Sequence, residues 1–108
     1  MEKQIIAYKG YYQAFMKKLN AKEQDKVRKA LLLLRSSERL PYHYIKHLRD
    51  GLYELRVSLG NNALRLFFIY DGDKIIVLFN GFRKKTQKTP KQEIDKALRL
   101  KKEYYEQR

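Results

Sequence analysis

The chain of 108 residues carries 25 Lys and Arg against 12 Asp and Glu, and its formal net charge of +13 favours nucleic acid or an anionic membrane surface as partner. Its length suits one domain, residues 1–108, and the absence of cysteine excludes disulfides and thiolate metal sites and fits a reducing compartment. No apolar stretch exceeds five residues, which predicts no membrane span or secretory leader, so we expect a cytoplasmic protein with no membrane partner, bound metal or small-molecule cofactor.

The beginning of the chain predicts a strand and a helix. Lys3–Tyr8 has the composition of a short strand. Gly10 then opens a helical segment through Leu19, in which Tyr11, Phe15 and Leu19 recur at intervals of four. This spacing places the three side chains on one apolar face of the helix.

A second helix follows directly. Asn20 and Glu23 have the spacing of a capping box, and the helical apolar pattern continues to about Ser37. The next segment, Glu38–Asp50, contains Pro41 and ends in an Asp-Gly turn signal. We therefore predict an irregular crossing connection there rather than a regular element.

Three consecutive strands are expected after this connection. They are Leu52–Leu59, Asn62–Tyr70 and Lys74–Phe82, separated by Gly60-Asn61 and by Asp71-Gly72. Both dipeptides are signals for short hairpin turns. The segment therefore predicts a three-stranded antiparallel meander.

The last predicted element is a helix. Thr89, Pro90 and Gln92 supply an N-cap, a first-turn proline and an N3 partner for it. The element order is then β-α-α-β-β-β-α, and we expect an α+β fold with two N-terminal helices packed on a small antiparallel sheet.

The first hairpin places two arginines on one face of the sheet. Strand alternation sets Glu54 and Arg56 on the side opposite to the apolar face of their strand. If Gly60-Asn61 is the turn, Arg56 lies directly opposite Arg65, and if the turn is Asn61-Asn62, Arg65 shifts along the strand but keeps its face. Opposed like charges destabilise a sheet by an amount comparable to the ~0.2–1 kcal/mol of a favourable pair, which favours a bound anion here.

The second hairpin extends this face. Its predicted pairing sets Leu64 opposite Phe79 and Ala63 opposite Asn80. Asn80 and Phe82 then lie on the same side of the sheet as the two arginines.

A cationic loop follows the last strand. Residues 80–90 include Arg83, Lys84, Lys85 and Lys88 and no acidic side chain. A loop of this kind that opens onto a helix start is a natural receiver of phosphate. Loop and arginines together predict a site for a polyanion.

Simpler interpretations compete with this site. Glu54 can neutralise Arg56 while Arg65 meets a carbonyl or the last helix, and the loop lysines can form a merely solvated charge run. Lys17 and Lys26, on the two N-terminal helices, are expected to lie away from the site.

The chain resembles the HigB-like branch of the RelE/ParE toxin superfamily. The resemblance rests on Gly51-Leu-Tyr-Glu-Leu-Arg56, on Arg65 in the next strand, and most specifically on Gly81-Phe-Arg-Lys-Lys-Thr-Gln-Lys-Thr-Pro90. It implies a RelE-like fold and a small toxin of a toxin–antitoxin pair, which cuts messenger RNA on the ribosome without a metal ion. It also implies an antitoxin partner, which we expect to be a helix-turn-helix protein.

The resemblance further implies roles for single residues. Arg56 and Arg65 are expected to stabilise the scissile phosphate during attack by a ribose 2′-hydroxyl, with Lys84 assisting proton transfer or the leaving oxygen. Phe82 is expected to stack on a splayed base. The other predicted RNA-binding residues are Glu54, Asn80, Arg83, Lys85, Lys88 and Lys46.

The identity of the catalytic base is open at this stage. Many members of the superfamily have histidine where this chain has Asn80, and an amide does not exchange a proton. The candidates are Glu54, His47, Lys84 and a C-terminal tyrosine such as Tyr104.

Two other functions fit parts of the same pattern. A ParE-like poison of DNA gyrase shares the fold and lacks the arginine and lysine constellation. A non-catalytic RNA-binding or ribosome-binding module would use the same cations only to position phosphates.

Overall fold

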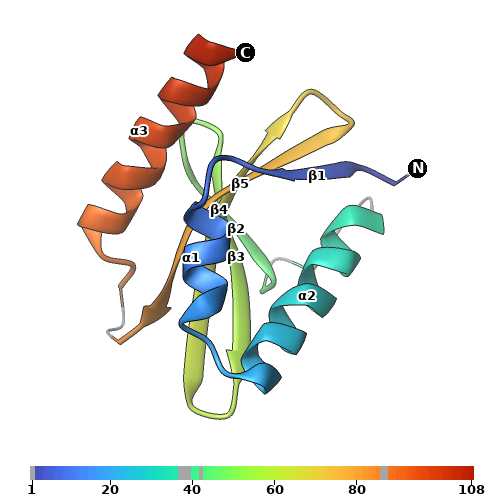
Figure 1. Cartoon of the computed structure of the whole chain (residues 1–108), viewed down its shortest axis with the longest axis vertical. Helices are drawn as coiled ribbons and strands as arrows, with labels where there is room; N and C mark the ends of the chain where they lie inside the picture. The colour runs from blue at the N-terminus through green and yellow to red at the C-terminus, as the bar shows by residue number, and fades with distance from the viewer. Residues whose placement is uncertain (1, 37–39, 42, 86–87) are drawn as a thin grey trace.

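The computed structural model describes residues 2–36, 40–41, 43–85 and 88–108. The elements in chain order are β1 Gln4–Ala7, α1 Tyr11–Lys17, α2 Ala21–Ser36, β2 Ile45–Arg49, β3 Leu52–Leu59, β4 Asn62–Asp71, β5 Ile75–Lys84 and α3 Lys91–Gln107. A five-stranded sheet packs against α1 and α2 on one face and against α3 on the other (Figure 1). The predicted α+β class, with two N-terminal helices on a sheet, is confirmed. Within the described residues, no helix combines the length and the apolar character that crossing a membrane requires.

The sheet has the strand order β1-β5-β4-β3-β2. The last four of these strands pair antiparallel, but β1 pairs parallel to β5, with Gln4 opposite Ile75 and Ala7 opposite Leu78. The prediction of a purely antiparallel sheet is therefore corrected to a mixed one. Because β1 and β2 are the two edges, the connection through α1 and α2 carries the chain across the whole sheet.

The segment predicted to be irregular contains an additional strand. Ile45 lies opposite Leu55 and His47 opposite Tyr53, and the register of this pairing shifts after His47. Pro41 and the Asp-Gly signal thus mark the two ends of the segment rather than an irregular structure along its whole length. The strand β2 widens the sheet on the side of the arginines.

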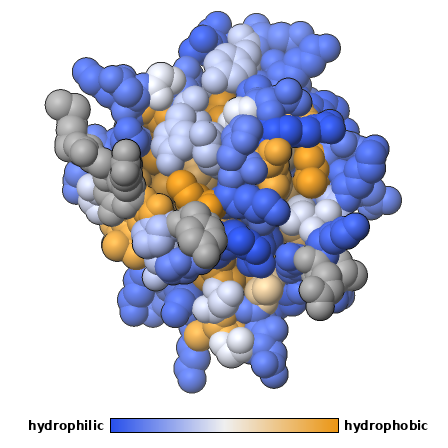
Figure 2. Space-filling model, turned by 180° about the vertical axis from the view of Figure 1, so that it is seen from behind, coloured by the Kyte–Doolittle hydropathy of each residue, from blue (hydrophilic) through white to orange (hydrophobic). Residues whose placement is uncertain are grey.

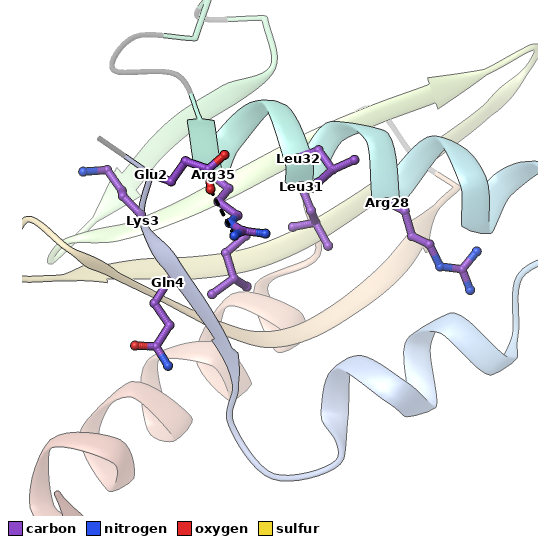
Figure 3. Close-up of a pocket in the computed structure, with 8 residues that line it drawn as sticks. Glu2, Lys3, Gln4, Arg28, Leu31, Leu32 and Arg35 are labelled. Atoms are coloured by element: carbon purple, nitrogen blue, oxygen red, sulfur yellow. Dashed lines mark ion pairs between the residues drawn. The ribbon is translucent and has the colours of Figure 1, made fainter.

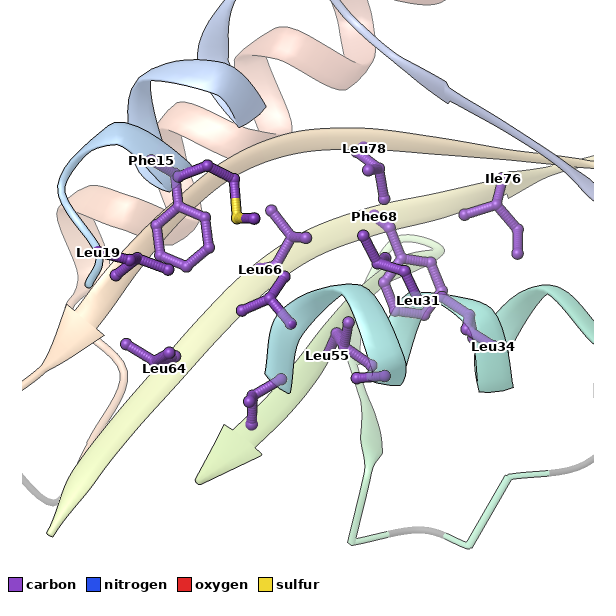
Figure 4. Close-up of a cluster of buried hydrophobic side chains, with 14 residues drawn as sticks. Phe15, Leu19, Leu31, Leu34, Leu55, Leu64, Leu66, Phe68, Ile76 and Leu78 are labelled. Carbon is purple, nitrogen blue, oxygen red and sulfur yellow. The ribbon is translucent and has the colours of Figure 1, made fainter. Parts of the chain in front are cut away.

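One core lies between the sheet and the two N-terminal helices. Alternate residues of the strands turn towards α1 and α2, as the period of two requires. The side chains drawn in Figure 4 include Phe15, Leu31, Leu34, Leu55, Leu66 and Phe68, all of which are buried. A second core lies under α3 and consists of Leu52, Phe67, Ile69, Val77, Phe79, Ala97 and Leu100.

The helix starts are only partly as predicted. The capping box is present, since the Glu23 N–H donates to Asn20 Oδ1 at 2.9 Å and the Asn20 N–H donates to Glu23 Oε1 at 3.0 Å. For α3, however, the N-cap residue is Pro90, with no side-chain cap. The predicted cap Thr89 is wrong because its hydroxyl bonds to Glu54 on the sheet instead.

The pairing of β3 with β4 has the register that a Gly60-Asn61 turn predicts. Val57 lies opposite Leu64, and Arg56 lies directly opposite Arg65. The first of the two predicted registers is therefore confirmed.

The predicted register between β4 and β5 is wrong. Asp71 pairs with Ile75, so the turn is a three-residue loop in which Gly72 has φ 70°, instead of a two-residue hairpin. Further along, Leu64 lies opposite Arg83 rather than Phe79.

The pairing of β4 with β5 changes register once, at a bulge in β5. Leu78 pairs with Phe68 and Gly81 with Leu66, so β5 has one extra residue between these pairs. Because of this extra residue, Phe82 lies on the same face of the sheet as Arg65, as the predicted register also implied. The bulge therefore decides which side chains of residues 80–84 face α3.

Candidate nucleic-acid interface

Two arginines from neighbouring strands meet on the α3 face of the sheet. Arg56 on β3 and Arg65 on β4 are directly opposed. Between them lies the carboxylate of Glu54, whose Oε1 is 3.8 Å from Arg56 Nε and 3.4 Å from Arg65 Nε. The competing interpretation, in which Glu54 pairs with Arg56, is thus part of the structure, but one carboxylate serves two guanidinium groups.

These three side chains differ in their exposure. Glu54 is 2% exposed and the Arg65 side chain 8%, whereas the Arg56 side chain is 32% exposed. Arg65 Nη1 donates to the carbonyl of Leu64 at 2.9 Å, and among the described residues its Nε has no hydrogen-bond partner. Burial lowers the pKa of Arg65, Glu54 opposes that shift, and Arg56 adds to it. The buried guanidinium therefore keeps donor capacity for an additional anion.

Two lysines complete the group. Lys46 on β2 lies opposite Glu54, and Lys84 at the end of β5 lies opposite Ala63. The pKa of Lys84 is lowered, first by burial and then by the positive charge of Arg65, with smaller effects of Arg56 and Lys46 and an opposing effect of Glu54. We call Lys46, Glu54, Arg56, Arg65 and Lys84 the cationic cluster. With four positive charges and one negative charge it carries a surplus of three, which attracts an anion.

Phe82 and Asn80 flank the cluster in different ways. Phe82 lies opposite Arg65 and stacks on Phe67, with ring centroids 5.7 Å apart. Asn80 is buried, and its Nδ2 donates to the carbonyl and to the Oε1 of Glu93 in α3 at 3.3 and 3.1 Å. Phe82 is thus placed beside the arginines as predicted from strand parity, while Asn80 fastens β5 to α3.

Arg83 lies away from the cationic cluster. It stands between Phe82 and Lys84 in the strand, so its side chain points to the other face, where it pairs bidentately with Glu23 of α2. Glu23 is fully buried, and the hydrogen bonds from Arg83, followed by the backbone bond of Asn20, lower its pKa to about 2. The structure therefore gives the predicted RNA-binding residue Arg83 a contact within the fold.

The loop after β5 returns to the cluster at its far end. Lys85 and Lys88 are exposed, and residues 86–87 between them lie outside the described part of the chain. The Thr89 hydroxyl donates to Glu54 Oε2 at 2.6 Å, so both oxygens of this buried carboxylate are engaged. Sequence reasoning missed this contact because Thr-Pro before a helix is also the pattern of an N-cap.

The family of the chain is given by its sequence. Residues 14–102 match the family described as phage-derived protein Gp49-like (DUF891). The chain belongs to this family. No curated protein matches its sequence. Among solved structures, a chain of the archaeal RelE–RelB complex from Pyrococcus horikoshii OT3 has a similar fold, with a TM-score of 0.51 and 18% sequence identity over 75% of this chain and 93% of that chain.

The four base candidates of this Gp49-like chain are now separated in space. His47 pairs with Tyr53, whose ring belongs to the core under α1 and α2, so it lies on the face opposite to the arginines. The Tyr104 hydroxyl donates to Asp71 at 2.6 Å, which raises the pKa of this tyrosine to about 12. Asp71 is six residues from Arg65 along β4, a distance of about 20 Å. Glu54 and Lys84 are the two candidates within the cluster.

One hollow on the surface of the Gp49-like chain borders the cationic cluster, and a larger one lies away from it. A cleft of about 280 Å³ borders the cluster and is lined by Lys46, Thr89 and the first turns of α3. A larger hollow of about 750 Å³ lies between β1 and α2, where Arg35 pairs with Glu2 (Figure 3). In residues 2–36, 40–41, 43–85 and 88–108, no three His, Asp or Glu side chains are grouped closely enough to bind a metal ion.

The surface character agrees with the charge balance. Figure 2 shows the back of the molecule, where hydrophilic side chains predominate and hydrophobic surface is exposed in separate areas.

Proposed function

We propose that the protein is the toxin of a toxin–antitoxin pair, of the HigB-like type, and that it is a ribosome-dependent endoribonuclease that cleaves messenger RNA. The observation that carries this proposal is the cationic cluster, in which Arg56, Arg65 and Lys84 surround a single carboxylate. The segment from Gly81 to Pro90, which resembles the toxin superfamily, also reaches the cluster, because the Thr89 hydroxyl near its end donates to Glu54.

The proposed reaction needs charge stabilisation and proton transfer. The ribose 2′-oxygen attacks the phosphorus, the bond to the 5′-oxygen breaks, and the products are a 2′,3′-cyclic phosphate and a 5′-hydroxyl. Guanidinium groups stabilise the extra negative charge of the pentacovalent phosphate, which is the role we assign to Arg56 and Arg65.

Acid–base catalysis falls to Glu54 and Lys84, the two base candidates that lie within the cluster. The 2′-hydroxyl loses a proton and the 5′-oxygen gains one, and we assign these transfers to Glu54 and Lys84 together. The lowered pKa of Lys84 favours this role, because proton transfer is most efficient when the pKa of the group approaches the working pH. Lys46 and Lys85 then bind phosphates on either side of the scissile one, and Phe82 stacks on a base.

An antitoxin protein is the second proposed partner. The structural relative from Pyrococcus horikoshii OT3 was solved as a RelE–RelB complex, and the net charge of +13 favours a partner with acidic contact residues. We expect it to be a small helix-turn-helix protein. Co-expression with such a protein from the adjacent reading frame should restore the growth of cells that express the toxin.

The enzymatic proposal is tested on programmed ribosomes. Purified protein is incubated with ribosomes carrying a defined messenger RNA, and cuts are mapped by primer extension. Arg65→Ala and Lys84→Ala should each reduce cleavage by about 10²-fold or more, whereas Lys17→Ala on α1 should cleave normally. Circular dichroism of each variant checks that it is folded. Ribosome binding without cuts, or inhibition of gyrase supercoiling without cuts, would contradict the proposal.

A further inference from the structure

A groove opens beside the cationic cluster at the edge of the sheet. It has a volume of about 420 Å³ and lies between α2 and the part of β3 that follows Arg56. The backbone N–H of Arg56 donates to the carbonyl of Tyr44 at 2.7 Å, and the pairing of β2 begins with Ile45. Within the described residues, β3 beyond Arg56 therefore has no strand partner on this side. The groove occupies the space beside this uncovered edge.

The groove and the cluster share one residue, Arg56. Arg56 lines the groove and also lies 3.8 Å from Glu54 in the cluster. A polymer that places one phosphate on Arg56 and Arg65 is therefore held by a residue that also borders the groove.

The chemistry of the lining fits one nucleotide. Lys26 and Lys29 stand three residues apart on α2 and thus share one side of the groove. Tyr44 also lines the groove, and its ring packs against that of His43 at 4.5 Å between centroids. Among the residues that the structure describes, the groove is otherwise lined by the small and apolar side chains of Ala30, Leu33, Val57 and Ser58, with no acidic side chain. Cations for phosphate, an aromatic face for a base and an apolar floor are the features that bind single-stranded nucleic acid.

We propose that this groove is a binding site for the nucleotide next to the scissile phosphate in single-stranded RNA. The base stacks on Tyr44, and the adjoining phosphate lies between Lys26 and Lys29. This inference deepens the proposed function and rests on it for the position of the scissile phosphate. It also moves Lys26, which the sequence placed away from the site, into the substrate path.

Binding to uncleavable RNA tests the groove independently of catalysis. A short fluorescent single-stranded RNA with 2′-O-methyl groups is titrated with the full chain, and affinity is measured by anisotropy. Tyr44→Ala and the double variant Lys26→Ala/Lys29→Ala should each lower the affinity at least about fivefold. Tyr44→Phe keeps the ring and should bind as the wild type does. Lys17→Ala, a lysine of α1 that is not part of the groove, is the matched control.

The cleavage pattern supplies the second measurement. If the ribonuclease proposal holds, Tyr44→Ala should still cut but should change the preference for the base beside the cut, whereas Arg65→Ala should lose the cuts. If wild-type protein makes no cuts, the ribonuclease proposal fails while the binding result still decides whether the groove takes a nucleotide. Unchanged RNA affinity in a folded Tyr44→Ala variant and in the double lysine variant would overturn the groove proposal.

Discussion

Close packing of α1 explains why the Gly81-Phe82 pair within β5 needs a glycine at its first position. A Cβ atom at Gly81 would lie 2.7 Å from two ring atoms of Phe15, which is buried in the core of α1 and α2. No ordinary Cβ contact is that short. The glycine therefore allows α1 to pack closely on the strand that carries Lys84.

Gly81→Ala should lower the free energy of unfolding by about 1–3 kcal/mol, because it overpacks a buried ring. Urea unfolding followed by circular dichroism measures this change. In the double variant Gly81→Ala/Phe15→Leu, the smaller side chain relieves the contact, so the two costs should be less than additive. Full additivity would mean that the Phe15 ring is not the obstacle.

Glu23 should make stability depend on pH. Its pKa is lowered from the usual 4.5 to about 2 by Arg83 and by the backbone of Asn20, so the folded state favours the carboxylate form. The stabilisation is then fully present above about pH 4.5 and is lost as the pH falls towards about 2. Urea unfolding at several pH values in this window should show the decline.

Glu23→Gln is the matching control. It should be less stable than the wild type at neutral pH, because Arg83 loses its charged partner, and its stability should fall less steeply in acid. Some slope should remain, because hydrogen bonds from Lys9 and Tyr8 also lower the pKa of Glu103. Identical acid profiles of variant and wild type would contradict the role of the Glu23 contact.

At the scale of the elements, local signals predicted the first hairpin and failed for the second. Gly60-Asn61 closes a two-residue turn, so the strand pattern fixed the opposition of Arg56 and Arg65. The second turn has three residues and is followed by a bulge, and neither follows from the dipeptide Asp71-Gly72. The isolated glycine at position 81 within a strand was the signal for the bulge.

The same limits apply to the site. Strand parity correctly brought Phe82 to the arginines, because the bulge compensated for the wrong turn length. Strand parity also predicts that Arg83 points to the other face. Sequence reasoning did not apply it there, because it treated residues 80–90 as a loop and not as the end of a strand. The contacts of Thr89 with Glu54 and of Asn80 with Glu93 join segments far apart in sequence, and no local pattern specifies them.

The start of α3 is docked on the sheet through Thr89. Because Glu54 is 2% exposed, removal of the hydroxyl that bonds to its Oε2 leaves a buried carboxylate with fewer donors. Thr89→Val should therefore lower the free energy of unfolding by about 1.5–3 kcal/mol, whereas Thr89→Ser should be close to the wild type. Thermal unfolding compares the three proteins. Equal stability of Thr89→Val and wild type would mean that the arginines alone satisfy Glu54.

At the scale of the whole molecule, the fold concentrates part of a general positive charge at one place. The net charge of +13 attracts any polyanion, and this general attraction weakens with salt. The cationic cluster differs from the remaining surface because its four cations come from β2, β3, β4 and β5 and surround one buried carboxylate. Specific and general attraction should therefore be separable by measuring how the RNA affinity changes with salt.

For single-stranded RNA, the logarithm of the binding constant should fall linearly with the logarithm of the salt concentration. Each phosphate contact should contribute about 0.7 to the steepness of this slope. Lys84→Ala and Lys85→Ala should each reduce this slope by about one contact and should also weaken toxicity in cells. Lys17→Ala removes the same charge from the surface of α1, so it should leave both the slope and the toxicity nearly unchanged. If the three variants lost affinity and slope equally, only the net charge would matter, and the cationic cluster would have no specific role in binding.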